Sequence, residues 1–133
     1  MAYTRRACAL LCGIVAVAGC RGGGAEGDSD PRYSAGATRT CLERSGAQVS
    51  SEDAEYVTQG DVSRGYEVAF EHNRLSMAFE RTGAVAATTA AGFAKYFVGD
   101  GKVQRRGNTV LAWDKRPSDA ERSRIESCLK PAL

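Results

Sequence analysis

A pair of alternating runs in the middle of the chain constrains the fold most. In residues 66–71 and 75–80, apolar side chains alternate with polar or small ones. A period of two residues is typical of strands with one buried face. With a turn at residues 72–74, the apolar side chains of both runs fall on the same side. The sequence therefore predicts an antiparallel hairpin.

A second hairpin is indicated by Gly107-Asn108, a pair that is common in two-residue turns. Residues 102–106 and 109–114 flank this pair, and the stretch TVLAW within the second flank is apolar on both sides, as in an interior strand. A shorter strand is expected at 47–49. The polar residues 50–64 are expected to be mostly loop.

Three helices are expected. Thr40 and Glu43 fit a capping box for a short helix at 40–45. The alanine-rich stretch 84–97 has helical spacing of its apolar residues. Ser118 and Glu121 fit a second capping box, which begins the last helix. The expected apolar faces consist of Ala86, Ala90, Phe93 and Phe97 in the second helix and Ile125, Cys128 and Leu129 in the third.

The expected order of elements is α-β-ββα-ββα. Hairpins that alternate with helices favour an α+β fold, with an antiparallel sheet of about four to five strands and two to three helices on one face. Residues 73–78 and 108–113 occupy matching places in the two ββα units, 35 residues apart. This repeat is weak, and chance explains it about as well.

The N-terminal segment has the pattern of an export signal. Arg5 and Arg6 precede thirteen uncharged residues, 7–19, that end in small side chains. A helix that spans a bilayer needs about 20 apolar residues, so this run is too short to cross a membrane as a helix. A basic start, a short apolar run and small residues at its end are typical of a secretory signal peptide.

Val17-Ala18-Gly19-Cys20 resembles the lipobox of bacterial lipoproteins, in which an aliphatic residue and two small residues precede a cysteine. The resemblance implies a diacylglyceryl group on the Cys20 thiol and cleavage just before Cys20. Two acyl chains are enough for stable anchoring. An ordinary signal cleaved near Ala18 and an uncleaved anchor are the alternatives. The sequence leaves open whether the Cys20 amine is also acylated.

Counting the cysteines predicts one disulfide. Cys8 and Cys12 belong to the expected signal and the lipid occupies Cys20, so Cys41 and Cys128 remain as a pair. In an exported, oxidising setting such a pair is expected to form a disulfide. A redox or metal-binding pair is the alternative, but the sequence has no Cys-x-x-Cys motif and one histidine.

Composition divides the chain into a signal at 1–19, a lipidated cysteine with a flexible glycine-rich tether at 20–37, and one α+β domain at 38–133. The chain has 18 basic and 16 acidic residues, and loss of Arg5 and Arg6 leaves the two kinds equal. A mature chain with no net charge gives no electrostatic argument for binding nucleic acid.

Few residues carry a signal for chemistry. His72 is the one histidine in the sequence and falls in a turn, where an exposed residue is the expectation. A general base and a metal ligand are the alternatives. The acidic residues of loop 50–64 do not fit a calcium loop and are expected to be solvated. No catalytic residue, metal ligand or cofactor is assigned. The weak candidates for contact with a ligand or partner are His72, Tyr96, Arg105, Arg106 and Trp113. The acidic residues of loop 50–64 mentioned above are Glu52, Asp53, Glu55 and Asp61.

The lipobox, the glycine-rich tether, the T-C-L-E helix, the GNTVLAW strand and the S-x-A-E-R…C-L helix are together similar to small lipoproteins of high-GC Gram-positive bacteria. The resemblance implies a place in the cell envelope and carries over no catalytic residue. We expect a domain anchored through Cys20 on the extracytoplasmic side of the cell membrane. It would bind an envelope protein or a small ligand through an open sheet face or a loop edge. An envelope enzyme that uses His72 or the acidic loop, and an accessory subunit of an envelope complex, are the alternatives.

Overall fold

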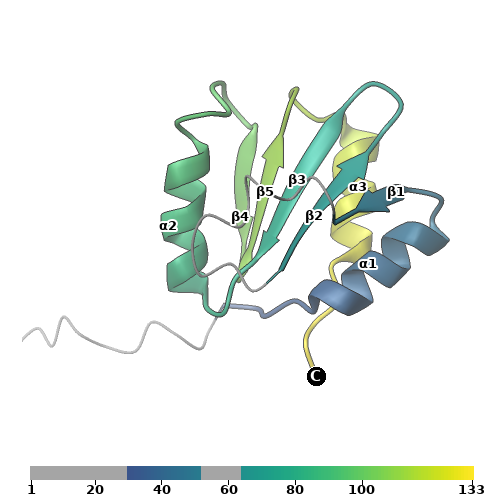
Figure 1. The fold of residues 1–133 in the computed structure, drawn as a ribbon, viewed down its shortest axis with the longest axis horizontal. Helices are drawn as coiled ribbons and strands as arrows, with labels where there is room; N and C mark the ends of the chain where they lie inside the picture. The colour runs from purple at the N-terminus through teal and green to yellow at the C-terminus, as the bar shows by residue number, and fades with distance from the viewer. Residues whose placement is uncertain (1–29, 52–63) are drawn as a thin grey trace, which may run out of the picture.

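The computed structural model describes residues 30–51 and 64–133, and Figure 1 shows the fold. In chain order the elements are α1 (Ala35–Arg44), β1 (Gln48–Ser50), β2 (Arg64–Ala69), β3 (Arg74–Phe79), α2 (Gly83–Phe93), β4 (Val103–Arg106), β5 (Thr109–Trp113) and α3 (Asp119–Cys128). The predicted α+β class and the predicted order of elements are confirmed.

The strands form one antiparallel sheet in the order β1-β2-β3-β5-β4. Both predicted hairpins are present, with Tyr66 opposite Met77 in the pair β2–β3 and with β4 next to β5. The hairpins join through β3 and β5, where Leu75 lies opposite Trp113. Strand β5 is therefore an interior strand, as its apolar pattern predicts.

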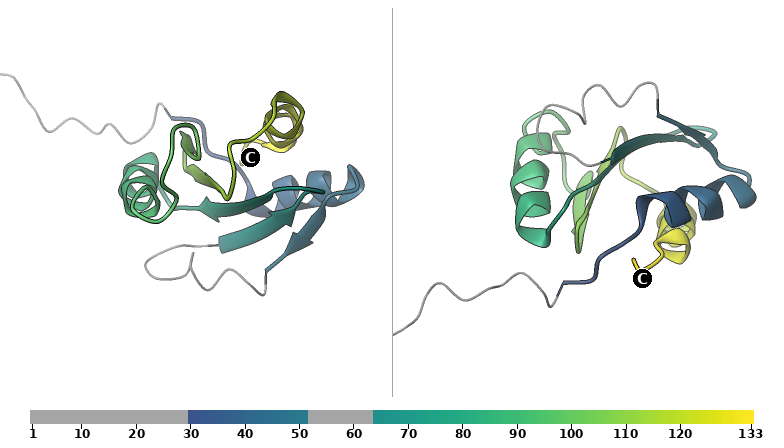
Figure 2. Two further views of the ribbon diagram at one scale, coloured as in Figure 1. Left: turned by 90° about the horizontal axis from the view of Figure 1, so that it is seen from above. Right: turned by 60° about the horizontal axis from the view of Figure 1, so that its bottom comes forward.

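Helices cover both faces of this sheet, whereas the sequence predicted them on one face. Helices α1 and α3 pack on one side, and α2 packs against β4 and β5 from the other side (Figure 2). The reason is β5, whose side chains are buried on both faces and so need cover on both. The core under α1 and α3 contains Leu42, Tyr66, Val68, Leu75, Met77, Phe79, Leu111, Trp113, Ile125, Cys128 and Leu129. The core under α2 contains Ala78, Ala86, Phe93, Val110 and Ala112.

The first helix begins earlier than predicted. Ser34, not Thr40, is the N-cap, and its hydroxyl accepts a hydrogen bond from the backbone N–H of Ala37. Thr40 lies inside α1, where its hydroxyl donates to the carbonyl of Gly36. Ser34 is the cap because tertiary bonding holds it in place, its own N–H donating to the carbonyl of Lys130 at 2.8 Å.

The other helix ends follow the sequence more closely. The capping box of Ser118 and Glu121 is present at the start of α3. Helix α2 starts after Thr82, whose hydroxyl accepts from the N–H of Val85, and it ends at Phe93 rather than at 97. Phe97 still lies against the core under α2, with its ring 5.9 Å from that of Phe93.

Residues 30–37 belong to the fold, so the predicted domain boundary at residue 38 is too late. The carboxylate of Asp30 pairs with Arg105 at 2.5 Å. Tyr33 forms a β-bridge with Pro131 near the C-terminus. The N–H of Asn108 donates to the carbonyl of Pro31. Composition alone suggested a tether here, but these contacts with β4, the β4–β5 turn and the C-terminus give the segment its order.

Gly107 is where the N-terminal segment comes closest to the β4–β5 turn. It has a φ of +53°, a backbone conformation that favours glycine. A Cβ at this position would overlap the carbonyl oxygen of Pro31. Glycine is therefore required at position 107 both by the backbone conformation of the turn and by the close approach of residues 30–33.

We expect Gly107→Ala to lower the free energy of unfolding by about 2–4 kcal/mol, since a left-handed backbone and an overlap with Pro31 act together. Gly101→Ala is the matched control, because Gly101 also has a positive φ, +77°, but no atom of the described residues lies within 4 Å of the added Cβ. Its expected loss is about 1 kcal/mol, from the backbone alone. Denaturant unfolding measures both, and equal losses would contradict the close approach to Pro31.

Candidate functional site

Two features of the sequence lie outside the described residues. Cys20 precedes residue 30, and the acidic residues Glu52, Asp53, Glu55 and Asp61 fall between 51 and 64. The lipid on Cys20 and the solvated acidic loop therefore stay predictions.

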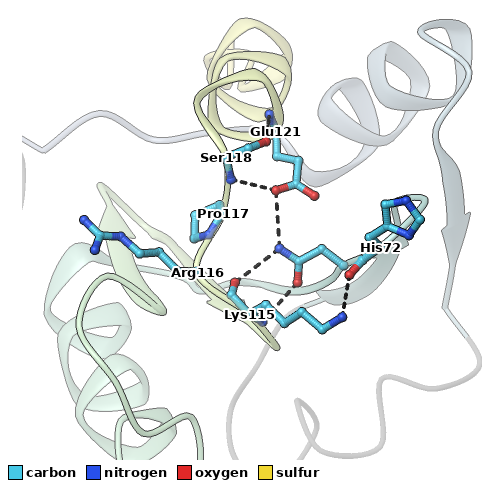
Figure 3. A pocket seen from close by; sticks show the side chains of 7 residues that line it. His72, Lys115, Arg116, Pro117, Ser118 and Glu121 are labelled. Carbon is cyan, nitrogen blue, oxygen red and sulfur yellow. Dashed lines mark hydrogen bonds between the residues drawn. The ribbon is translucent and has the colours of Figure 1, made fainter.

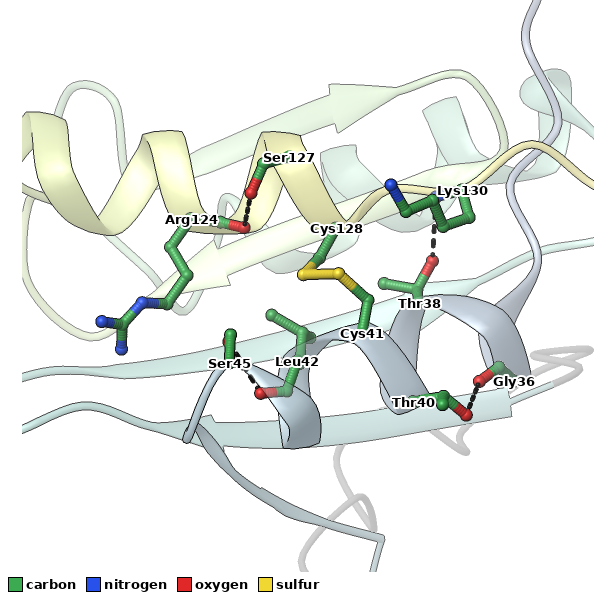
Figure 4. Close-up of a disulfide and its surroundings, with 10 residues drawn as sticks. All are labelled: Gly36, Thr38, Thr40, Cys41, Leu42, Ser45, Arg124, Ser127, Cys128 and Lys130. Atoms are coloured by element: carbon green, nitrogen blue, oxygen red, sulfur yellow. Dashed lines mark hydrogen bonds between the residues drawn. A yellow bond between two sulfur atoms is a disulfide. The ribbon is translucent and has the colours of Figure 1, made fainter.

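The predicted cysteine pair is joined. Cys41 in α1 and Cys128 in α3 form a disulfide with their Cα atoms 5.3 Å apart (Figure 4). Beside it, the buried hydroxyl of Thr38 accepts a hydrogen bond from the backbone N–H of Lys130 at 3.3 Å. The bond thus holds the first and last helices of the domain together. Since both sulfur atoms are used in it, neither is a free nucleophile or metal ligand in this state.

Removal of the disulfide should cost about 4–5 kcal/mol of unfolding free energy, because the bond spans a sequence separation of 87 residues. The double variant Cys41→Ser with Cys128→Ser, unfolded in denaturant, measures this. A reducing agent should lower the stability of the parent chain by a similar amount and leave that of the double variant unchanged. A reductant effect of equal size on both proteins would assign the loss to another bond.

A group of charged side chains lies where the β2–β3 turn meets the connection from β5 to α3. We call it the charged end, and it consists of His72, Arg74, Lys115, Arg116 and Glu121. Figure 3 shows four of these residues around a depression of about 450 Å³. A second depression, of about 430 Å³, adjoins it and shares His72, Asn73 and Lys115 with it.

The side chain of Asn73 connects the two segments that carry the charged end. It is buried, and its side-chain oxygen accepts hydrogen bonds from the N–H groups of Arg74 and Lys115, at 2.9 and 3.0 Å. Its side-chain nitrogen donates to the carbonyl of Lys115 and to the carboxylate of Glu121. That carboxylate also accepts from the N–H of Ser118, as part of the capping box. One amide therefore ties the β2–β3 turn to the start of α3.

His72 is an exposed turn residue, as the sequence led us to expect. Its side chain is 84% exposed, and its imidazole lies 3.5 Å from the equally exposed Glu71. The amine of Lys115 donates to the backbone carbonyl of His72, not to its ring. Among the residues that the structure describes, no buried group orients this imidazole, so the arrangement there is poor for general acid–base chemistry.

Two of the weak candidates have opposite surroundings. Trp113 is fully buried, with its ring 5.6 Å from that of Phe70, so it does not line a groove. The interior position of β5 is the cause, since the indole faces the core under α1 and α3. Tyr96 lies in the turn after α2 and is 83% exposed.

Arg105 and Arg106 lie on the edge strand β4, and both are held by the domain itself. Arg105 pairs with Asp30, and Arg106 pairs with Glu126 of α3 at 3.2 Å. The antiparallel register places β4 residues 105–106 against the start of β5, whereas Lys115 follows its end. The structure therefore separates these arginines from the charged end, and it does not bring the predicted contact residues together.

Sequence reasoning missed Asn73, Asn108 and Glu80. The two asparagines occupy matching places in the weak repeat, which is the signal that could have found them. Glu80 is buried next to α2, where one carboxylate oxygen accepts from the hydroxyl of Thr89 at 2.6 Å. Among the described residues, its other oxygen has no hydrogen-bond partner. Glu80 faces α2 and takes no part in the charged end.

Comparison of the chain with family models, with curated proteins and with solved structures finds no match. In the ranges 30–51 and 64–133, no group of three or more His, Cys, Asp or Glu side chains is placed to hold a metal ion. Over the same ranges, no helix has the length and hydropathy needed to span a bilayer.

We expect Asn73→Ala to lower the free energy of unfolding by about 2–3 kcal/mol, because it removes the hydrogen bonds from Asn73 to both backbone groups of Lys115 and one of the hydrogen bonds that the carboxylate of Glu121 accepts. The adjacent His72→Ala is the control and should change stability by less than about 0.5 kcal/mol, since the ring is exposed. Thermal or denaturant unfolding measures both. A large loss in His72→Ala would show that the imidazole has a structural partner.

Proposed function

We propose that this chain is a cell-envelope protein, anchored on the extracytoplasmic side of the membrane by lipid on Cys20. Its domain serves as a non-enzymatic binding module for an envelope protein or a small ligand. The observation that carries the proposal is the disulfide between Cys41 and Cys128.

The disulfide supports export, because such bonds form and persist outside the reducing cytoplasm. It also gives the lipobox-like cysteine a separate role. With Cys41 and Cys128 joined, and with Cys8 and Cys12 in the expected signal, Cys20 is the cysteine left for acylation. The two features are independent, since the bond joins helices of the domain and the lipobox stands before residue 30.

Binding is favoured over catalysis by the character of the charged end. It offers the cations of Arg74, Lys115 and Arg116 beside two open depressions. Its histidine is exposed, and the imidazole lies 3.5 Å from the exposed carboxylate of Glu71. Exposed charges over a rigid support suit recognition of a polar partner, whereas acid–base catalysis needs a positioned and protected group.

Peptide mass mapping under non-reducing conditions, on protein taken from its native membrane fraction, tests the proposal. We expect an N-terminal peptide that begins at Cys20 and carries the mass of a diacylglyceryl group. We also expect one linked peptide pair that contains Cys41 and Cys128. A Cys20→Ala variant is the matched control, and it should lose the lipid mass and the membrane association together.

Two results would contradict the proposal. An unmodified Cys20 in the membrane fraction removes the anchor. Free thiols at Cys41 and Cys128 in freshly isolated protein remove the argument for an oxidising compartment, and they return the two cysteines as candidates for redox chemistry.

A further inference from the structure

The outward face of α2 differs from those of the other helices. From residue 82 to residue 94 the chain has no charged side chain. The exposed positions of α2 are Ala84, Val85, Ala87, Thr88 and Ala91. By contrast, α1 and α3 expose charged residues such as Glu43, Arg44 and Glu126. A helix that faces water normally carries charged or polar residues on its outer side, so this face is unusual.

Exposed large apolar side chains concentrate at the same place. Among the described residues they are Val85, Tyr96, Val98 and the C-terminal Leu133. Val85 belongs to α2 and is 37% exposed, while Tyr96 and Val98 lie in the turn after the helix end at Phe93 and are 83% and 73% exposed. Apolar residues gathered on one part of a surface indicate a contact. We call this surface the α2 face, and it consists of the exposed positions of α2 together with Tyr96 and Val98.

The start of the described chain lies against α2. Asp30 pairs with Arg105, and a Cβ on Gly83, the first residue of α2, would come within 2.6 Å of the Asp30 carboxylate. Residues 21–29 are all that separate Asp30 from Cys20. An extended chain covers at most about 3.6 Å per residue, so a lipid on Cys20 keeps the membrane within about 35 Å of the start of α2.

Charges around the α2 face suit lipid headgroups. Arg81 precedes α2 and is exposed, and Lys95 and Lys102 follow it as exposed and half-buried cations. Asp100 is an acidic residue of the same turn. Cations near a bilayer are attracted to anionic lipids, and a tyrosine is favoured at the level of the headgroups.

We propose that the α2 face rests on the surface of the membrane that holds the lipid of Cys20, an inference that rests on the proposed function. Apart from Val85, Tyr96 and Val98, the apolar side chains of the face are alanines, so the face orients the domain while the lipid supplies the anchoring. Two acyl chains are enough for anchoring, so the weak apolar contact has to supply orientation only. The charged end and the side covered by α1 and α3 then stay open to a partner.

Fluorescence quenching in vesicles tests this orientation. The full chain, expressed in its native host and purified from the membrane fraction, is reconstituted in phosphatidylethanolamine and phosphatidylglycerol with brominated acyl chains. Tyr96→Trp reports on the α2 face, and Ser123→Trp, exposed on α3, is the matched control. Trp113 is fully buried in both and gives the same background. We expect the added emission at position 96, and not that at 123, to be lost with brominated lipid.

A second pair of variants asks whether the apolar character matters. Ala87→Glu puts a charge in the middle of the α2 face, and Ala120→Glu puts the same charge on an exposed position of α3. Combined with Tyr96→Trp, the first should restore the emission in brominated vesicles, and the second should leave the quenching unchanged.

Equal quenching at positions 96 and 123, or none at 96, would overturn the orientation. If the emission at position 96 is not quenched by brominated lipid but changes when the protein is diluted in lipid, a second copy of the chain lies on the α2 face. This result would also overturn the proposed orientation. The mass of the N-terminal peptide is read on the same sample. Absence of lipid on Cys20 contradicts the proposed function whatever the quenching shows, so the two failures are distinguishable.

Discussion

Strand β5 is buried along its whole length, from Thr109 to Trp113, and the layers of the fold follow from this. Leu111 and Trp113 point into the core under α1 and α3, and Val110 and Ala112 point into the core under α2. Full burial of a leucine or valine side chain contributes about 1.5–3 kcal/mol. A strand that buries both of its faces needs a neighbour on each side and a layer above and below. Strands β3 and β4 are the neighbours, and the helices are the layers.

Both ends of β5 are held by asparagine side chains. At its start, the amide of Asn108 accepts from the N–H of Tyr33 at 2.6 Å and donates to the carbonyls of Tyr33 and Glu80. Just past its end, the amide of Asn73 holds both backbone groups of Lys115. Each amide is buried and links segments far apart in the chain. The weak repeat therefore has a structural meaning: each hairpin carries an asparagine that fastens the sheet to a segment outside it.

The sequence was most informative where local rules decide the structure. Alternation predicted both hairpins, the capping box at Ser118 predicted the start of α3, and cysteine counting predicted the disulfide. The sequence was misleading where contacts between residues far apart in the chain decide the structure. Thr40 fits a capping box, but Ser34 caps α1 because Lys130 bonds it. A polar, glycine-containing stretch reads as tether, but residues 30–33 are ordered by contacts with Asn108 and Pro131, which no local pattern reveals.

The candidate site was harder to predict than the fold for the same reason. Exposure of His72 follows from its turn, so the sequence could supply it. Trp113 has a polar tip and suggested a groove, yet its strand position buries it completely. The arginines of β4 suggested a contact with a partner, yet their side chains donate hydrogen bonds to backbone carbonyls of their own hairpin. Arg105 donates to the carbonyl of Gly107, and Arg106 donates to the carbonyl of Arg105. Charged side chains that cover edge carbonyls in this way oppose pairing with a further strand. The two arginines thus act against pairing of the β4 edge with another strand. No sequence motif distinguishes this role from binding to a partner.

The two cores differ in how firmly they hold their helices. The core under α1 and α3 contains large side chains and is closed by the disulfide. The core under α2 is made mainly of alanine and valine, with Phe93 and Phe97 at one end. Small side chains bury little apolar area, so α2 gains less from the sheet than the other helices do. Local stability follows buried contact, and α2 is therefore the layer that profits most from additional cover. The same helix has an uncharged outer face. Contact of this face with the membrane surface, as proposed above, would add apolar burial that the sheet alone does not give α2.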